Sequence, residues 1–181
     1  MHGDNYIDAA GIQSIYDKSI VNGINASWVA LSPNVDDFTP DRRVNEHALV
    51  GFRLTLAAQL WEIDQWCSPQ LWGQDARQVC YFKCNTVDDS MRGQGIGKSL
   101  LLKSIENAKA QGAHAGLAHI WLASPNNSAF AYFSACGGKL VKEHPNKWQI
   151  HSIEDNYDCP VCGSFCTCTA AEMLLDFSES E

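Results

Sequence analysis

Apolar runs alternate with polar and glycine-containing stretches along the chain, and this pattern predicts an alternation of strands and helices. The runs HALVGFRLTL (47–56) and VCYFKCNTV (79–87) are short and rich in β-branched and aromatic residues, which is typical of strands. KSLLLKSIENAKAQG (98–112) instead predicts a helix that ends at Gly112. Its apolar residues recur every three to four positions: Leu100, Leu101, Ile105 and Ala108.

The remaining segments give weaker patterns. Apolar residues at nearly helical spacing in IDAAGIQSIYDKSIV (7–21) predict a first helix, and the proline-punctuated stretch 32–47 predicts a loop or a mobile cover. GLAHIWLASPNNSAFAYFSACGGKLV (116–141) predicts strand, helix, glycine turn and strand. Segment 57–75 is ambiguous, because its tryptophans Trp61, Trp66 and Trp72 fit either a core or the wall of a pocket.

Composition restricts the class of protein. With 181 residues, 45% of them hydrophobic and six of them Trp, the chain can bury one core, and we expect one domain with a small appendage. The net charge of −8 argues against a nucleic-acid binder, which needs a basic face. No apolar run reaches the ~18 residues of a membrane span, and the N-terminus lacks the pattern of a secretory leader. We therefore expect a cytoplasmic protein.

The glycine-rich stretch MRGQGIGKS (91–99) joins the second strand to the long helix. A Walker A loop requires Gly at position 92, which is Arg92, and the dinucleotide fingerprint requires Gly at position 98, which is Lys98. Both common nucleotide-binding loops therefore fail by spacing. What remains is R-x-x-G-x-G at a helix N-terminus, where free backbone N–H groups and the helix dipole attract a pyrophosphate.

This stretch resembles the central motif of the GNAT superfamily of acyl-CoA-dependent N-acetyltransferases, [Q/R]-x-x-G-x-[G/A] after a strand that ends in Val. Val87 precedes Arg92 by five residues, as in that family, although Asp89 replaces its common Pro. The block 116–141 resembles the family's strand, N-x-x-A-x-x-x-[Y/F] helix and Gly turn, with Asn126, Ala129, Phe133 and Gly137 at those positions. More faintly, the first helix resembles the opening of phosphinothricin-type amino-acid acetyltransferases.

The resemblance implies a fold and a cosubstrate. The fold is α/β, a mixed, twisted sheet of about six to seven strands flanked by helices, with an acyl-CoA cleft between the strands that end at Val87 and near Ala123. The cosubstrate is acetyl-CoA, whose pantetheine arm would bond to backbone near Thr86 and Val87 and lie close to Asn126. The residues that we expect to contact the cosubstrate are Thr86, Val87, Arg92, Gly93, Gln94, Gly95, Ile96, Gly97, Lys98, Asn126 and Phe133.

Catalysis requires a base for the amine and an acid for the departing thiolate. Many family members place a Glu on the strand before the loop, but VCYFKCNTV has no acidic residue. Asp88 and Asp89 follow this strand directly and are the candidate bases; Glu62 and Asp64, in the ambiguous segment 57–75, are the alternatives. The acid is commonly a Tyr on the second helix, where this chain has Phe133; the adjacent Tyr132 is therefore the candidate acid, although it points about 100° away on a helix.

The C-terminal part contains DCPVCGSFCTC (158–168), which brings four cysteines into ten residues. C-P-x-C-G is typical of a zinc knuckle, and Cys159, Cys162, Cys166 and Cys168 could form a Cys₄ site. The alternative is a reduced, flexible Cys-rich tail. Because the acyl-CoA motifs end before residue 145, we expect an acetyltransferase domain at 1–155 and a separate tail at 156–181 that acyl-CoA binding does not need.

Two functions from different classes fit these observations. The first is an acetyl-CoA-dependent N-acetyltransferase acting on the primary amine of a small molecule or amino acid. The second is a non-catalytic acyl-CoA-binding regulatory or interaction protein with a metal-binding tail, which Phe133 and the missing strand Glu favour. For both we expect no nucleic-acid and no membrane partner, and zinc as the metal; a homodimer is left open.

Overall fold

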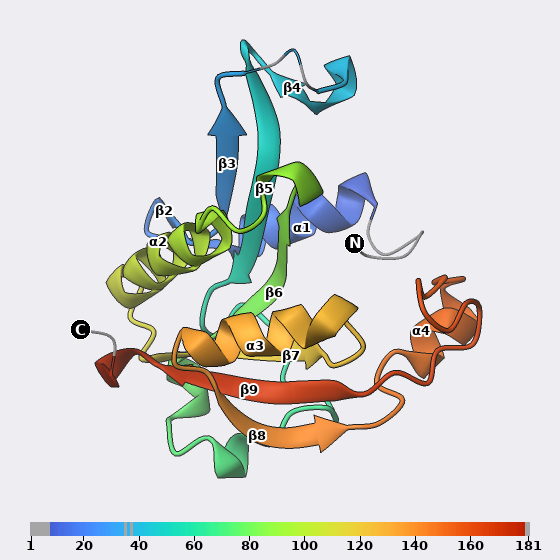
Figure 1. Ribbon diagram of the computed structural model, residues 1–181. Helices are drawn as coiled ribbons and strands as arrows, with labels where there is room; N and C mark the ends of the chain where they lie inside the picture. Colours follow the sequence, from blue (N-terminus) through green and yellow to red (C-terminus); the bar gives the residue numbers. More distant parts are fainter. Residues whose placement is uncertain (1–7, 35, 37, 180–181) are drawn as a thin grey trace.

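The computed structural model describes residues 8–34, 36 and 38–179, and in it a mixed sheet carries helices on both faces (Figure 1). The strands of this sheet are β3 (Trp28–Ser32), β4 (Arg43–Val44), β5 (His47–Leu56), β6 (Val79–Val87), β7 (Ala115–Trp121), β8 (Lys139–His144) and β9 (Ala170–Asp176). The α-helices of the described residues are α1 (Ala9–Lys18), α2 (Ile96–Ala110), α3 (Ser128–Ala135) and α4 (Gln149–Glu154). A small ribbon of β1 (Ile20–Val21) and β2 (Ile24–Asn25) follows α1.

The large sheet has the strand order β3-β5-β6-β7-β9-β8, and β4 also pairs with β5. Its pairs are antiparallel except β6 with β7, which are parallel and joined through α2. Parallel neighbours need such a crossover, because a tight turn reverses the direction of the chain. In Figure 1, α2 and α3 lie in front of the sheet and α1 lies behind it. The predicted mixed sheet of six to seven strands with flanking helices is confirmed.

Strand β9 comes from the part of the chain in which the sequence predicted only a Cys-rich tail. It lies between β7 and β8, pairs with β7 along its whole length from Ala170 to Asp176, and is buried over Ala170–Leu175. The run AAEMLLD is therefore an interior strand. The predicted domain of residues 1–155 does not contain the whole sheet, and of the predicted tail the stretch between α4 and β9 adds no strand to it.

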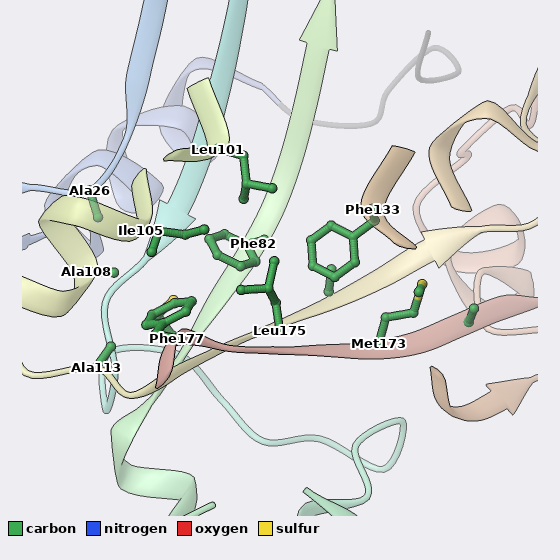
Figure 2. Close-up of a cluster of buried hydrophobic side chains, with 13 residues drawn as sticks. Ala26, Phe82, Leu101, Ile105, Ala108, Ala113, Phe133, Met173, Leu175 and Phe177 are labelled. Atoms are coloured by element: carbon green, nitrogen blue, oxygen red, sulfur yellow. The ribbon is translucent and has the colours of Figure 1, made fainter. Parts of the chain in front are cut away.

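The main core fills the space between the sheet and the helices α2 and α3 (Figure 2). Phe82 of β6, Phe133 of α3 and Phe177 after β9 meet there, with ring centroids 5.9 Å apart for Phe82–Phe133 and 6.3 Å for Phe82–Phe177. Met173 and Leu175 of β9 complete this layer. The core is thus built from both ends of the described chain.

Helix α1 is shorter than predicted and less buried. Only Ile15 of its residues is buried, whereas Ile12 and Tyr16 are exposed. Residue 7, which the predicted helix included, lies outside the described residues. The helix therefore buries one apolar side chain, and this residue also lines a cavity described below, together with Ser14 and Lys18.

The ambiguous segment 57–75 is a loop, and one buried carboxylate helps to hold it against the sheet. Glu172 of β9 is fully buried and accepts hydrogen bonds from the Ser68 backbone N–H (2.8 Å), the Trp72 indole N–H (2.7 Å) and His144 Nε2 (2.8 Å). These bonds hold the pKa of Glu172 below its usual value, against the opposing effect of burial. Of the two readings of the tryptophans, Trp72 is core, while Trp61 packs on that core and also borders a cavity.

Candidate active site where two parallel strands part

Strands β6 and β7 pair over only three residues, Val79–Tyr81 with Ala115–Leu117. Beyond this point β6 continues along β5 as far as Val87, and β7 continues along β9 as far as Trp121. The two strands therefore part, and both border a cavity of about 550 Å³, which α2, α3 and the glycine-rich loop also line. We call it the donor cavity.

The glycine-rich loop forms one end of the donor cavity. Gly93 and Gly95 have φ values of +77° and +80°, in the left-handed region that favours glycine, and α2 begins directly after Gly95. The first turn of this 15-residue helix contains no acidic residue, and Lys98 lines the cavity. Arg92 is held in place by Asp89 (2.5 Å) and by the Val87 carbonyl (3.2 Å). The loop therefore presents a helix N-terminus and two cationic side chains, an arrangement suited to a pyrophosphate.

Most of the residues that the sequence proposed for the cosubstrate line this cavity. They are Thr86, Val87, Arg92, Gly93, Gly95, Ile96, Gly97, Lys98 and Phe133. Gln94 and Asn126 are exposed and are not among the residues that line the cavity. Asn126 instead has a φ of +54° in the turn that precedes α3, so its place in the structure is that of a turn residue.

Three buried polar atoms without a protein partner belong to residues that line the donor cavity: Arg53 Nε, Asn85 Oδ1 and Thr86 Oγ1. Arg53 is only 2% exposed and lies over the Phe82 ring. Buried polar groups in native proteins are nearly always hydrogen-bonded. A polar ligand that runs between β6 and β7 would pass beside these residues.

A second cavity of about 420 Å³ is lined by α1, the loop 57–75 and the segment around α4. We call it the acceptor cavity. It shares four lining residues with the donor cavity: Lys83, His119, Trp148 and Tyr157. The two cavities therefore meet at the point where the strands part.

His119 of β7 lies at this junction and is tied to two neighbours. Its Nε2 is 2.6 Å from the Trp66 carbonyl oxygen, so Nε2 carries the proton, and Nδ1 accepts a hydrogen bond from the Tyr81 hydroxyl at 3.0 Å. Burial, together with the charge of Lys147, lowers the pKa of His119 to about 4. The imidazole is therefore neutral at physiological pH. Its Nδ1 is connected to the acceptor cavity through the hydroxyl of Tyr81, which lines that cavity.

Two lysines also line the acceptor cavity. Lys83 is the extra residue of a β-bulge in β6, because Leu54 pairs with Cys84 and Thr55 with Phe82. Protein atoms around its ammonium group desolvate it and lower its pKa, although the side chain stays accessible from the cavities. Lys147 is only 8% exposed, and desolvation lowers its pKa as well.

The candidate bases Asp88 and Asp89 lie away from the junction and line neither cavity. After Val87 the chain turns into a short 3-10 helix (Asp89–Met91), which directs both carboxylates elsewhere. Asp88 bonds to Ser90 and to Arg42 (2.6 Å), and these contacts lower its pKa to about 2. A carboxylate with so low a pKa is a poor proton acceptor. The Asp89 carboxylate is paired with the Arg92 guanidinium.

The candidate acid Tyr132 lines the donor cavity. Its hydroxyl donates to the Gly97 carbonyl (2.8 Å) and accepts from Arg53 (3.2 Å). Burial raises the pKa of Tyr132, which keeps the phenol protonated. Phe133 is 1% exposed and packs in the core against Phe82, so the Phe at the family's Tyr position is a core residue here.

Sequence reasoning missed the group at the junction, namely Tyr81, Lys83, His119, Lys147, Trp148 and Tyr157. A signal was present: Lys83 and His119 are polar residues inside apolar strand runs, VCYFKCNTV and AGLAHIW. The four predicted metal ligands, Cys159, Cys162, Cys166 and Cys168, come together in one cluster. That cluster packs against Trp148 and Tyr157.

Solved structures of other proteins share this fold at low sequence identity. The chain superposes on Naa20 of Chaetomium thermophilum, solved with a bisubstrate analogue, with a TM-score of 0.61 and 14% identity over 97% of this chain and 76% of that one. For Ard1 of Thermoplasma volcanium the TM-score is 0.57, with 13% identity over 94% and 80%. For the IAA acetyltransferase of Bacillus cereus it is 0.53, with 14% identity over 83% and 99%.

Among curated proteins, no sequence matches the chain. The model of the acetyltransferase (GNAT) family does match, over residues 46–137. This range is half of the chain and holds β5, β6, the glycine-rich loop, α2, β7 and α3, which line the donor cavity. The chain therefore belongs to the GNAT acetyltransferase family.

Proposed function

We propose that this protein transfers the acetyl group of acetyl-CoA to the primary amine of a small molecule or an amino acid. The observation that carries the proposal is the junction of the donor and acceptor cavities at the parting of β6 and β7. A thioester entering from one side and an amine entering from the other would meet there. Holding two reactants in contact supplies a large part of the rate acceleration of such a transfer.

On the donor side, the residues present fit acetyl-CoA. The loop and Lys98 suit the pyrophosphate, and the buried polar atoms of Arg53, Asn85 and Thr86 suit the amide groups of the pantetheine arm. The NatC complex, whose structure is similar with a TM-score of 0.55 and 12% identity, was solved with CoA and a peptide. Acetyl-CoA supplies the thioester carbonyl that the amine attacks.

On the acceptor side, the charges of the cavity favour an amine that also carries a carboxylate. Lys83 and Lys147 line this cavity together with Lys18, and so do the acidic residues Asp64, Glu62 and Asp155. A carboxylate of the acceptor would pair with the lysines, and its amine would be drawn toward Asp64. An amino acid has both groups, which agrees with the resemblance of the first helix to amino-acid acetyltransferases.

The proton route that the geometry supports best runs through Tyr81 to His119. When the amine nitrogen attacks the thioester carbon, it becomes positively charged and acidic. Its proton can pass to the Tyr81 oxygen while the Tyr81 proton passes to His119 Nδ1. Collapse of the intermediate then breaks the carbon–sulfur bond, and the thiolate of CoA leaves toward the donor cavity, where the Tyr132 phenol lies.

Replacing Tyr81 by Phe is expected to lower kcat about 10²-fold and to leave the Kd for acetyl-CoA unchanged, because the ring stacks on Trp61 as before while the hydroxyl that bonds to His119 is lost. His119→Ala should give a similar loss, while His114→Ala, at an exposed histidine, should not. Since His119 protonates only as the pH falls through about 4, the wild-type kcat should show no loss from this group between pH 7 and 5. Wild-type turnover in Tyr81→Phe would exclude this route.

Replacing Tyr132 by Phe is expected to lower kcat by roughly 10²-fold if this phenol protonates the departing thiolate. The affinity for acetyl-CoA should change little, because the ring keeps its place beside Gly97. The measurement is steady-state turnover together with calorimetric binding. A variant with normal turnover would show that Tyr132 only fastens α3 to α2 through the Gly97 carbonyl.

The proposal as a whole is tested by release of free CoA thiol over a panel of amines, with amino acids and amines that lack a carboxylate. We expect turnover with amino acids and at least ~10-fold lower kcat/KM with the matched decarboxylated amines. Acetyl-CoA binding without turnover on any amine would instead support the non-catalytic, acyl-CoA-binding alternative. Hydroxyl acceptors in the same panel check that the product is an amide.

A further inference from the structure

The segment between α4 and β9 brings four thiols to one point. The Sγ atoms of Cys159, Cys162, Cys166 and Cys168 all lie within 4.8 Å of one another. The Sγ atom of Cys168 is 3.8 Å from that of Cys159 and 3.4 Å from that of Cys162. A tetrahedral ion with metal–sulfur bonds of about 2.3 Å requires sulfur–sulfur separations of about 3.8 Å. The spacing is that of a four-thiolate site, far beyond the ~2.05 Å of a disulfide bond.

The backbone of this segment is folded to aim the first two thiols at a common centre. Cys159 and Gly163 exchange two hydrogen bonds, Cys159 N–H to the Gly163 carbonyl at 3.0 Å and Gly163 N–H to the Cys159 carbonyl at 2.8 Å. Gly163 has a φ of +72°, a conformation that glycine adopts without strain. The tight turn places Gly163 opposite Cys159 and brings the Cys162 thiol within 4.8 Å of the Cys159 thiol, as a knuckle with two residues between its ligands requires.

The cluster is shielded from water and fastened to the fold. Cys159, Cys166 and Cys168 are at most 6% exposed, and Trp121, Trp148 and Tyr157 pack around them. The Cys166 backbone N–H donates to Ser152 Oγ at 3.0 Å, and this hydroxyl donates to the Gln149 carbonyl at 2.7 Å. The loop is thereby held on α4, so the four sulfurs are positioned by the protein and not by one another.

We propose that Cys159, Cys162, Cys166 and Cys168 bind one zinc ion, and that this ion fixes the wall shared by the donor and acceptor cavities. Four thiolates leave no open coordination position, so the ion is structural. Trp148 and Tyr157 pack on the thiol cluster and line both cavities. This second part rests on the proposed function, whereas binding of the ion does not.

The zinc site is tested by elemental analysis of the full chain purified under reducing conditions without chelator and then incubated with Zn²⁺. We expect about one equivalent of zinc in the wild type and less than ~0.1 equivalent in Cys162→Ser, which changes the most accessible of the four thiols. Cys136→Ser is the control, since Cys136 is a half-buried free thiol outside the cluster, and it should keep its zinc. Bound Co²⁺ should give the strong visible absorption of tetrahedral thiolate ligation.

Three results would overturn the site: zinc absent from folded wild type after incubation, iron in its place, or disulfides, seen as a mass lowered by 2 or 4 Da in protein purified under the same reducing conditions.

The link to the acceptor cavity has its own readouts. Because Trp121 and Trp148 pack on the thiols, loss of zinc should shift tryptophan emission to longer wavelength while the far-ultraviolet circular dichroism stays native. In Cys162→Ser the KM of the acceptor should rise at least ~10-fold, with the Kd for acetyl-CoA within ~3-fold of wild type. Unchanged emission and KM in the zinc-free variant would overturn the role in the wall, and absent turnover in zinc-loaded wild type would count against the proposed function alone.

Discussion

Truncation after residue 155 is expected to unfold the protein and to abolish acetyl-CoA binding, although the motifs for acetyl-CoA all lie before residue 145. The truncation removes β9, which lies between β7 and β8 and pairs with both. It also removes Met173, Leu174 and Leu175, each at most 8% exposed. Loss of each such side chain costs about 2–5 kcal/mol, and three together are comparable with the whole stability of a domain, about 5–15 kcal/mol.

Circular dichroism, thermal melting and calorimetric titration with acetyl-CoA measure this result. Truncation after Ser178 is the matched control, because it keeps β9 and the buried Phe177, and it should melt and bind like the full chain. A folded chain of residues 1–155 that still binds acetyl-CoA would contradict this expectation and support the domain boundary that the sequence predicts.

Gly95→Asp is expected to weaken acetyl-CoA binding more than ~30-fold, which corresponds to about 2 kcal/mol. Gly95 caps the N-terminus of α2 with a φ of +80°, where backbone N–H groups and the helix dipole would hold the pyrophosphate. A carboxylate there repels that anion and competes for the same N–H groups. No heavy atom lies within 4 Å of a Cβ built at Gly95, so the side chain itself has space.

Gly95→Asn is the control for this experiment. Asn and Asp have nearly the same size and both tolerate a left-handed backbone, so the two variants share the conformational cost and differ in charge. Gly95→Asn should lose clearly less affinity than Gly95→Asp in calorimetry. Equal affinity of both variants and the wild type, with the fold intact, would show that the pyrophosphate does not bind at this end of α2.

The sequence predicted the strands and helices whose pattern is local and strong. β5 and β6 begin and end at the predicted residues; polar residues precede both apolar runs, at Glu46 and Gln78, and Asp88 follows the second. The donor cavity also followed from local motifs, since the loop and the start of α2 are consecutive in the chain. By contrast, AAEMLLD is a short apolar run beside four cysteines, and nothing local shows that it pairs between two earlier strands.

The residues at the junction of the two cavities could not be predicted from local sequence patterns, for a similar reason. Tyr81 and His119 meet because β6 and β7 are parallel neighbours whose pairing ends at Tyr81 and Leu117. Lys83 is the extra residue of a bulge, and its position depends on register against β5. Asp88 and Asp89 show the opposite case: they are close to the site in sequence, but the turn after Val87 directs them to Arg42 and Arg92.

The position of β9 also has a consequence for how the chain is made. Until residue 176 has left the ribosome, β7 and β8 have no partner between them, and the hydrogen-bonding edge of β7 stays open. Open edges of this kind pair with other chains, so the nascent protein is exposed to aggregation until β9 has emerged. We expect the sheet to close only after translation has passed β9.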